Sequence, residues 1–400
     1  MSPYNKSTHK PKNIQYLRHS NRAAIIRQFA TKGVASRSEL VSELQLTKMA
    51  ISTIVSELLN ENLLQECGAI DDSGAQSSGP NAGRKPMALI IPDYRINAIG
   101  IFVFRYQMSG IAIDIKGNCF YSTSMDIPPE TDNDRFIELI TALIQDIISA
   151  NKKTTFAGIG IASIGPLDIY SQTILNPPNF RNIKDVCVGN IVRERFDLPV
   201  FLDNDMNAGA LGNYLYGIAK EMKNTVYLGL GSGVGAGVIV DGHMLHGSGG
   251  YAGEVGHMSI QMDGPQCSCG RRGCLELYTN TISLLQNAGV HTMEELVQIV
   301  TSAQVSEKVK RCMDDYYRAV LSGLITIANT FDPEIIIIGD QGVRLAPLFL
   351  TELEKEMNEQ IFQRESHNIR LAVSSFGERA PLVGAGAMVF ERIFNGELPL

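Results

Sequence analysis

One histidine and three cysteines lie close together in the segment 251–278, YAGEVGHMSIQMDGPQCSCGRRGCLELY. His257 precedes Cys267, Cys269 and Cys274, and glycine and proline residues bend the chain between them. One imidazole and three thiolates form a donor set that suits tetrahedral Zn²⁺. Because four protein ligands leave no open coordination position, such an ion would be structural rather than catalytic. The alternatives are a loop with incidental thiols or a disulfide in a secreted protein. A Cys-x-Cys pair is awkward to bridge, however, and nothing here suggests secretion.

Two carboxylates flank these four residues. Glu254 precedes the histidine, and Glu276 follows the last cysteine. Carboxylates accept hydrogen bonds from neighbouring hydroxyl groups, so a loop held by a metal can present both acids to a polyol. The alternative is that both are surface acids, and the two residues alone do not decide between these interpretations.

A further polar pair, Asn204 and Asp205, lies at the end of segment 199–205, PVFLDND. The apolar start of this segment is typical of a buried strand. In open α/β sheets ligands bind at the carboxyl ends of the strands, which is where Asn204 and Asp205 would lie. The simpler role for such residues is to cap the helix that follows, and the two roles can coexist.

The glycine-rich segment 229–237, GLGSGVGAG, raises the question of phosphate binding. Backbone N–H groups of such a turn can wrap a phosphate. The segment is not a dinucleotide fingerprint, because a hairpin is predicted to follow it and no helix. A plain turn between two strands explains the glycines equally well, so this segment alone does not separate an enzyme from a binding protein.

The motifs G-E-V-G-H and C-S-C-G-R-R-G-C-L-E resemble the signature of the ROK family, which contains sugar repressors and sugar kinases. The resemblance extends over nearly the whole chain. It implies that the zinc ligands are His257, Cys267, Cys269 and Cys274. It also implies a sugar site in which the histidine serves twice, formed by Asn204, Asp205, Glu254, His257 and Glu276. In ROK kinases the residue matching Asp205 is the base that deprotonates the attacking hydroxyl.

ROK kinases also need a first phosphate loop of the kind Asp-x-Gly-Gly-Thr. The corresponding segment here, 100–106, reads GIFVFRY and has no Asp, no paired Gly and no Thr. Asp340, in GDQG near the expected nucleoside loop, adds a further negative charge. Because phosphoryl transfer depends on metal binding and positioning, we expect this chain not to be an enzyme.

The first 92 residues predict a separate domain with a basic surface. They contain 11 Lys or Arg and 7 Asp or Glu, whereas the whole chain has a net charge of −7. Apolar spacing predicts helices over 21–30, 36–46 and 48–60, the last two joined as a helix-turn-helix. The exposed residues of the third helix, which would enter a DNA major groove, are Lys48, Met49, Ser52 and Thr53.

Two strands, at 63–67 and 87–91, are predicted to enclose a Gly/Ser/Pro-rich wing. The wing ends in Arg84 and Lys85, which can reach DNA phosphates or a minor groove. A helical dimerisation unit with a solvated loop is the alternative. The basic wing favours DNA binding, and the head is also similar to the winged helix of ROK repressors.

The remainder of the chain predicts two α/β lobes. Strand meanders starting at 98 and 225 have a Gly-containing turn at the same place, and each is followed later by a helix and an apolar strand ending in Gly. This duplication resembles the hexokinase–actin architecture. The predicted fold is therefore α/β, with a winged helix-turn-helix at 1–92, a first lobe at 93–200 against which 382–400 packs back, and a second lobe with the zinc loop at 201–381.

Four hundred residues without an apolar run of membrane-spanning length, and without a signal-peptide pattern, indicate a cytoplasmic protein with reduced thiols. The function that we expect is a homodimeric, or higher-order, repressor that binds operator DNA and responds to a sugar or sugar phosphate. Two alternatives stay open: an active ATP-dependent sugar kinase with an added DNA-binding head, and a repressor controlled by a protein partner.

Overall fold

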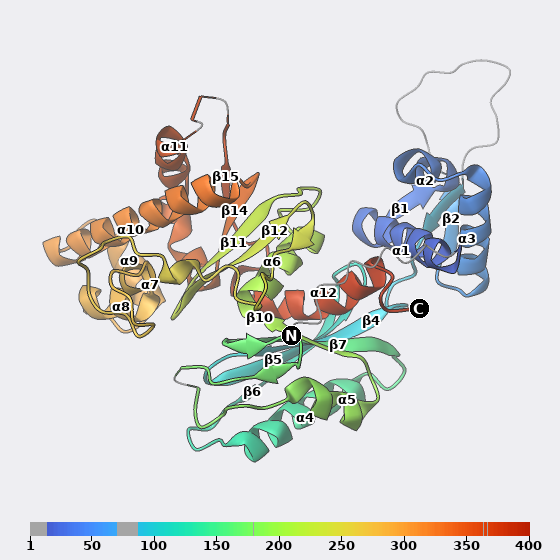
Figure 1. The fold of residues 1–400 in the computed structure, drawn as a ribbon, viewed down its shortest axis with the longest axis horizontal. Helices are drawn as coiled ribbons and strands as arrows, with labels where there is room; N and C mark the ends of the chain where they lie inside the picture. Colours follow the sequence, from blue (N-terminus) through green and yellow to red (C-terminus); the bar gives the residue numbers. More distant parts are fainter. Residues whose placement is uncertain (1–13, 70–86, 179, 363, 366) are drawn as a thin grey trace.

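The computed structural model describes residues 14–69, 87–178, 180–362, 364–365 and 367–400. The head comprises three helices and a small antiparallel sheet of order β1-β3-β2 (Figure 1). Its elements are α1 (Ile14–Lys32), β1 (Val34–Ser36), α2 (Arg37–Leu44), α3 (Lys48–Asn60), β2 (Gln65–Ala69) and β3 (Met87–Ile90).

Local sequence explains where the helices of the head begin. Ser36 accepts a hydrogen bond from the Glu39 N–H and the Glu39 carboxylate accepts one from the Ser36 N–H, which completes a capping box at α2. Thr47 caps α3 by accepting from the Ala50 N–H at 3.2 Å. The predicted bounds of the third helix are confirmed, and its predicted core residues are buried: Ile51, Ile54, Val55 and Leu58.

The predicted wing strands are present as β2 and β3, which pair antiparallel. Residues 70–86 are not among those that the structure describes. The predicted DNA contacts Arg84 and Lys85 therefore lie outside the described residues.

The body contains two five-stranded sheets, of orders β10-β7-β4-β5-β6 and β13-β12-β11-β14-β15. The first sheet is formed by β4 (Asn97–Val103), β5 (Gln107–Asp114), β6 (Cys119–Asp126), β7 (Phe156–Ser163) and β10 (Val200–Asn204). The second is formed by β11 (Thr225–Leu230), β12 (Val234–Val240), β13 (His243–Met244), β14 (Ile335–Gly339) and β15 (Arg370–Val373). The two predicted meanders are thus present, although β13, the third strand of the second, is short.

The expected boundary between residues 200 and 201 is wrong, because it cuts through β10. Val200 to Asn204 pair in parallel with Ile159 to Ser163 of β7, so β10 is an edge strand of the first sheet. The apolar sequence of β10 is explained by this pairing, and the first lobe continues to the start of α6.

Helices cover both sheets. Figure 1 shows α4 (Asn133–Ala150) and α5 (Val188–Phe196) on the first sheet. Between β7 and α5 in the chain, β8 (Leu167–Asp168) and β9 (Thr173–Ile174) pair as a short antiparallel hairpin. At the end of the molecule remote from the head lie α7 (Glu276–Thr279), α8 (Thr281–Ala288), α9 (Met293–Val300) and the start of α10 (Glu307–Phe331). Helix α11 (Leu350–Gln360) precedes β15.

Two helices join the parts of the molecule. Helix α12 (Ala380–Phe394) is buried over most of its length and packs on β4, β7 and α6 (Asp205–Tyr216). A Cβ atom at Gly384 would lie 1.7 Å from the Ala208 carbonyl oxygen, so only glycine permits this close approach of α12 and α6. Residues of α1, including Ile25 and Phe29, share one apolar core with α6 and α12. No helix in the described residues is long and apolar enough to cross a membrane.

Candidate metal centre and adjoining acidic cluster

The four predicted metal ligands lie together. The donor atoms of His257, Cys267, Cys269 and Cys274 all lie within 4.8 Å of one another. The Sγ atoms of Cys269 and Cys274 are 3.7 Å apart, and the Cys267 Sγ lies 3.8 Å from the His257 Nδ1. A tetrahedral site with metal–sulfur bonds of about 2.3 Å has sulfur–sulfur edges of about 3.8 Å. The donor set and its spacing therefore fit a four-coordinate ion such as Zn²⁺.

Backbone hydrogen bonds hold the loop in this shape without help from a regular sheet. The Ile260 N–H donates to the Gly273 carbonyl and the Leu275 N–H to the Met258 carbonyl, both at 2.8 Å. Gly273 has a φ of +65°, and a Cβ atom there would lie 1.7 Å from the Gln261 carbonyl oxygen. Glycine is thus required at the turn that brings Cys274 back beside His257.

The thiols differ in acidity according to their surroundings. Burial, followed by hydrogen bonding of the Cys274 thiol to Cys267 and Cys269, raises the pKa of Cys274 to about 12. The backbone N–H of Arg271 is the main cause that lowers the pKa of Cys269. A bound divalent cation favours the thiolate form of every ligand, so metal binding would be coupled to proton release.

Asn204 and Asp205 lie where β10 ends and α6 begins. The Asn204 Oδ1 accepts from the Met206 N–H at 2.9 Å, so the expected capping role is present. The Asp205 side chain is only 6% exposed. The pKa of Asp205 is raised to about 7, mainly by burial and in addition by the charges of Asp340 and Glu254.

Glu254 and Glu276 approach this pair from the second lobe. The Glu276 Oε2 accepts from the Val234 N–H at 2.9 Å, which fixes that carboxylate against the glycine-rich turn. The pKa of Glu254 is raised, mainly by burial. The charge of His257 opposes this change, and the charge of Glu276 adds to it. Glu254 is thus close enough to Asp205, His257 and Glu276 for charges to interact, and Asn204 is adjacent to Asp205 in sequence.

The glycine-rich turn between β11 and β12 is occupied by carboxylates of the chain itself. A Cβ atom at Gly231 would lie 1.8 Å from the Asp340 Oδ2, so the Asp340 carboxylate packs directly against this glycine. Burial raises the pKa of Asp340 to about 6. With Asp340 against Gly231 and Glu276 on the Val234 N–H, an incoming phosphate would meet two acids at this turn.

Segment 100–106, which we expect to stand in place of a first phosphate loop, forms the end of β4 and the tight turn to β5. The Phe104 N–H donates to the Gln107 carbonyl at 2.9 Å. Arg105 donates to the Pro178 carbonyl, and the Arg181 guanidinium lies 4.9 Å from the centroid of the Tyr106 ring. Bulky side chains and their contacts therefore hold this turn closed.

Two contacts next to the cluster had no signal in the sequence. The His246 Nε2 lies 2.7 Å from the Asp203 Oδ2, which joins the segment after β13 to the end of β10. Burial by itself lowers the pKa of His246, but the hydrogen bond and attraction to Asp203, together with the charge of Glu391, outweigh it and raise this pKa. This ion pair joins the two lobes directly behind Asn204.

The second contact joins the same region to the head. The Arg27 Nη2 on α1 donates to the Tyr214 Oη on α6 at 3.0 Å, and its guanidinium lies 5.9 Å from the ring centroid. Helix α6 begins at Asp205, so one helix extends from the acidic cluster to the head.

All four described residues of the predicted DNA-binding face are exposed: Lys48, Met49, Ser52 and Thr53. Met49 is 80% exposed, although methionine is usually buried. The face is thus accessible at the N-terminal end of α3.

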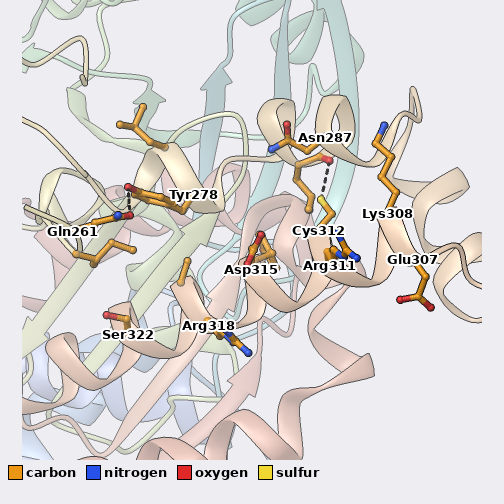
Figure 2. Close-up of a pocket in the computed structure, with 15 residues that line it drawn as sticks. Gln261, Tyr278, Asn287, Glu307, Lys308, Arg311, Cys312, Asp315, Arg318 and Ser322 are labelled. Carbon is orange, nitrogen blue, oxygen red and sulfur yellow. Dashed lines mark hydrogen bonds between the residues drawn. The ribbon is translucent and has the colours of Figure 1, made fainter. Parts of the chain in front are cut away.

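A groove of about 900 Å³ lies elsewhere, between α8, α10 and the outer side of the metal loop (Figure 2). Tyr278 and Gln261 are hydrogen-bonded at 2.8 Å on one wall, and Arg311, Asp315 and Arg318 project from α10. Its described lining includes none of the five residues predicted to bind a sugar.

Comparison with known proteins gives a consistent result. Residues 98–392 match the ROK family. The xylose repressor of Bacillus spizizenii is 31% identical over 387 residues, which span 95% of this chain and 97% of the relative. A crystal structure described as a ROK family transcriptional regulator, homolog of E. coli MLC protein, has a TM-score of 0.76 at 23% identity and covers 96% of this chain and 98% of its own. A Streptomyces griseus ROK glucokinase, solved with glucose and AMPPNP, has a TM-score of 0.64 at 22% identity and covers 73% of this chain and 98% of its own.

Proposed function

Since the chain belongs to the ROK family, we propose that it is a DNA-binding transcriptional repressor whose kinase-like body senses a sugar. The observation that carries the proposal is a combination within one chain. The helix-turn-helix, whose α3 has an exposed outer face, is joined to a body that retains the acids proposed to bind a sugar. In the same body the Asp340 carboxylate fills the space beside Gly231, in the glycine-rich turn. Relatives named xylose repressor, which match nearly the whole chain, support the same conclusion.

The proposed sugar site consists of Asn204, Asp205, Glu254, His257 and Glu276. Carboxylates and an amide accept and donate hydrogen bonds to neighbouring hydroxyl groups, and buried polar groups gain most from such partners. Asp205 at the start of α6 and Glu276 at the glycine-rich turn would bind opposite edges of one ring.

A structural Zn²⁺ ion bound by His257, Cys267, Cys269 and Cys274 is part of the proposal. When bound, the ion supplies folding free energy to a loop that has little regular structure. The ring orientation of His257 and the positions of Glu254 and Glu276 on either side of the loop then depend on this one centre. The role proposed for the metal is to hold the sugar-binding acids in place.

Phosphoryl transfer is not part of the proposed function. The turn between β4 and β5 lacks an Asp that could serve a metal, and Arg105 binds the Pro178 carbonyl. Asp340 packs against Gly231, where a nucleotide phosphate would approach. Phosphoryl transfer relies on electrostatic stabilisation of the transferred group, so an acid at this position opposes it.

Coupling of the sugar to DNA binding is proposed to run through α6. Asp205 lies at one end of this helix and Tyr214, which contacts Arg27 of the head, lies near the other. Close packing of α6 against α12 makes small independent motions costly, so the helix would move as a unit. A sugar that binds one lobe arrangement better by about 1–3 kcal/mol would shift the position of the head.

A homodimer, or a higher oligomer, is proposed because two related heads match two half-sites of a symmetric operator. Lys48, Met49, Ser52 and Thr53 of each α3 would face the major groove, and Arg84 and Lys85 would bind DNA beside it.

The experiment is calorimetric titration of the full-length protein with D-xylose, D-glucose and N-acetyl-D-glucosamine, together with an assay of sugar-dependent ATP hydrolysis. We expect saturable binding of one sugar and no turnover. Appreciable turnover would instead support the kinase alternative. Absence of binding by every sugar would favour control by a protein partner.

A further inference from the structure

The charge of the proposed sugar site restricts the chemical class of its effector. Among the described residues, no lysine or arginine forms a hydrogen bond or ion pair with Asp205, Glu254, Glu276 or Asp340. The charged groups that raise the pKa of Asp205 are Asp340 and Glu254, both of which are acids. The site thus contains several carboxylates that are not paired with a lysine or arginine among the described residues.

Several basic side chains on neighbouring elements are already engaged. Arg105, on the β4–β5 turn, donates to the Pro178 carbonyl. Arg392 binds the Glu397 carboxylate at 2.6 Å, with its guanidinium 5.5 Å from the centroid of the Phe201 ring. His257 offers its Nδ1 to the metal cluster, and a metal-bound imidazole is neutral.

Two backbone donors of the glycine-rich turn are already engaged. The Val234 N–H donates to Glu276, and the Gly231 N–H donates to the Gly233 carbonyl at 3.1 Å. The Asp340 carboxylate covers Gly231 from the opposite side. A phosphate ester usually needs arginine, lysine or several free N–H groups, and this side of the site presents carboxylates instead.

We propose that the effector is an uncharged sugar and that sugar phosphates are rejected by the acids around the site, with Asp340 as a specificity-determining residue. The inference rests on the proposed function, because it concerns the same site. Acids suit a neutral sugar, whose hydroxyl groups donate hydrogen bonds to them. A phosphate monoester carries a charge of about −1.5 to −2 near pH 7. At an effective dielectric constant of about 20, each unit of negative charge held about 6 Å from one carboxylate weakens binding by roughly 100-fold.

The test compares each sugar with its own phosphate ester by titration calorimetry of the full-length protein at pH 8. The pairs are D-xylose and D-xylose 5-phosphate, D-glucose and D-glucose 6-phosphate, and N-acetyl-D-glucosamine and its 6-phosphate. We expect the preferred sugar to bind at least about 100-fold more tightly than its ester. An ester that binds as tightly as its parent sugar, or more tightly, overturns the inference while leaving the proposed sugar-sensing function standing.

Two variants identify the groups responsible. Asp340→Asn keeps the side-chain shape but removes one charge, and should reduce the preference for the neutral sugar by roughly 100-fold, the effect of one carboxylate. Asp241→Asn, on an exposed turn, should leave it unchanged. An unchanged preference in Asp340→Asn overturns the role of Asp340. Loss of ester binding in Arg105→Gln would identify Arg105 as a phosphate ligand and contradict the inference. If neither member of any pair binds at millimolar concentration, the proposed function fails together with this inference.

Discussion

Replacement of Asp205 by asparagine should stabilise the unliganded protein, and increasingly so as the pH rises. Burial and the charge of Asp340 raise the pKa of Asp205 from its ordinary value of 3.8 to about 7 in the folded protein. The folded state therefore holds this proton over a pH range in which the unfolded chain has released it. Stability falls through this range and levels off above the folded pKa.

The magnitude follows from the size of the pKa change. At about 1.4 kcal/mol per pH unit, the carboxylate destabilises the folded protein by about 2 kcal/mol at pH 5.5 and about 4 kcal/mol at pH 8. The substituted amide would not titrate, and its oxygen can still accept the hydrogen bond that Asp205 receives from the Met206 N–H. The advantage of Asp205→Asn should thus grow by about 2 kcal/mol between these two pH values.

Urea unfolding followed by far-UV circular dichroism measures this difference, since the chain contains no tryptophan. Asp241→Asn, at an exposed turn, is the matched control and should leave the pH profile unchanged. A variant that is less stable than the parent at pH 8, or an advantage that does not change with pH, would refute the description of Asp205 as a buried acid facing other acids. Saturating sugar should reduce the advantage, because its hydroxyl groups would satisfy the carboxylate in the parent protein.

Three further predictions concern the metal, the coupling and the DNA-binding face. Cys267→Ser should abolish stoichiometric zinc by elemental analysis and lower the melting temperature by at least about 10 °C, and full zinc retention would contradict the ligand assignment. Tyr214→Phe removes the hydrogen bond from Arg27; it should preserve sugar affinity but reduce the effect of sugar on operator affinity by at least about 3-fold, and an unchanged effect excludes this path. Lys48→Ala should weaken operator binding by about 3- to 10-fold and reduce the slope of log affinity against log salt concentration by about 1. An unaltered slope would show that Lys48 does not contact a phosphate.

The sequence predicted well those features that depend on local patterns. The bounds of α3 follow from Thr47 as its cap and from apolar residues at helical spacing. The grouping of the four candidate metal ligands could be predicted because they come from one continuous loop that is rich in glycine. The expected loss of the first phosphate loop rests on a missing motif and stays a prediction; in the structure Arg105 donates to the Pro178 carbonyl beside this turn.

Features that depend on tertiary contact could not be predicted in this way. The strand pattern of 199–205 was recognised, but its pairing with β7 rather than with the second sheet is a property of chain topology. Asp340 was expected to add a charge, whereas its packing against Gly231 joins residues more than one hundred positions apart. The contacts His246–Asp203 and Arg27–Tyr214 join single polar residues on different elements, and no periodicity marks such pairs in advance.

The central claim is that sugar binding in a catalytically inactive body controls the affinity of the head for DNA. Fluorescence anisotropy of the full-length protein with an operator duplex, selected from a random pool, measures this directly when the sugar identified by calorimetry is added. The account predicts that the sugar weakens operator binding by at least about 10-fold, within the range of ordinary allosteric coupling. Operator affinity that stays the same at saturating sugar would contradict it.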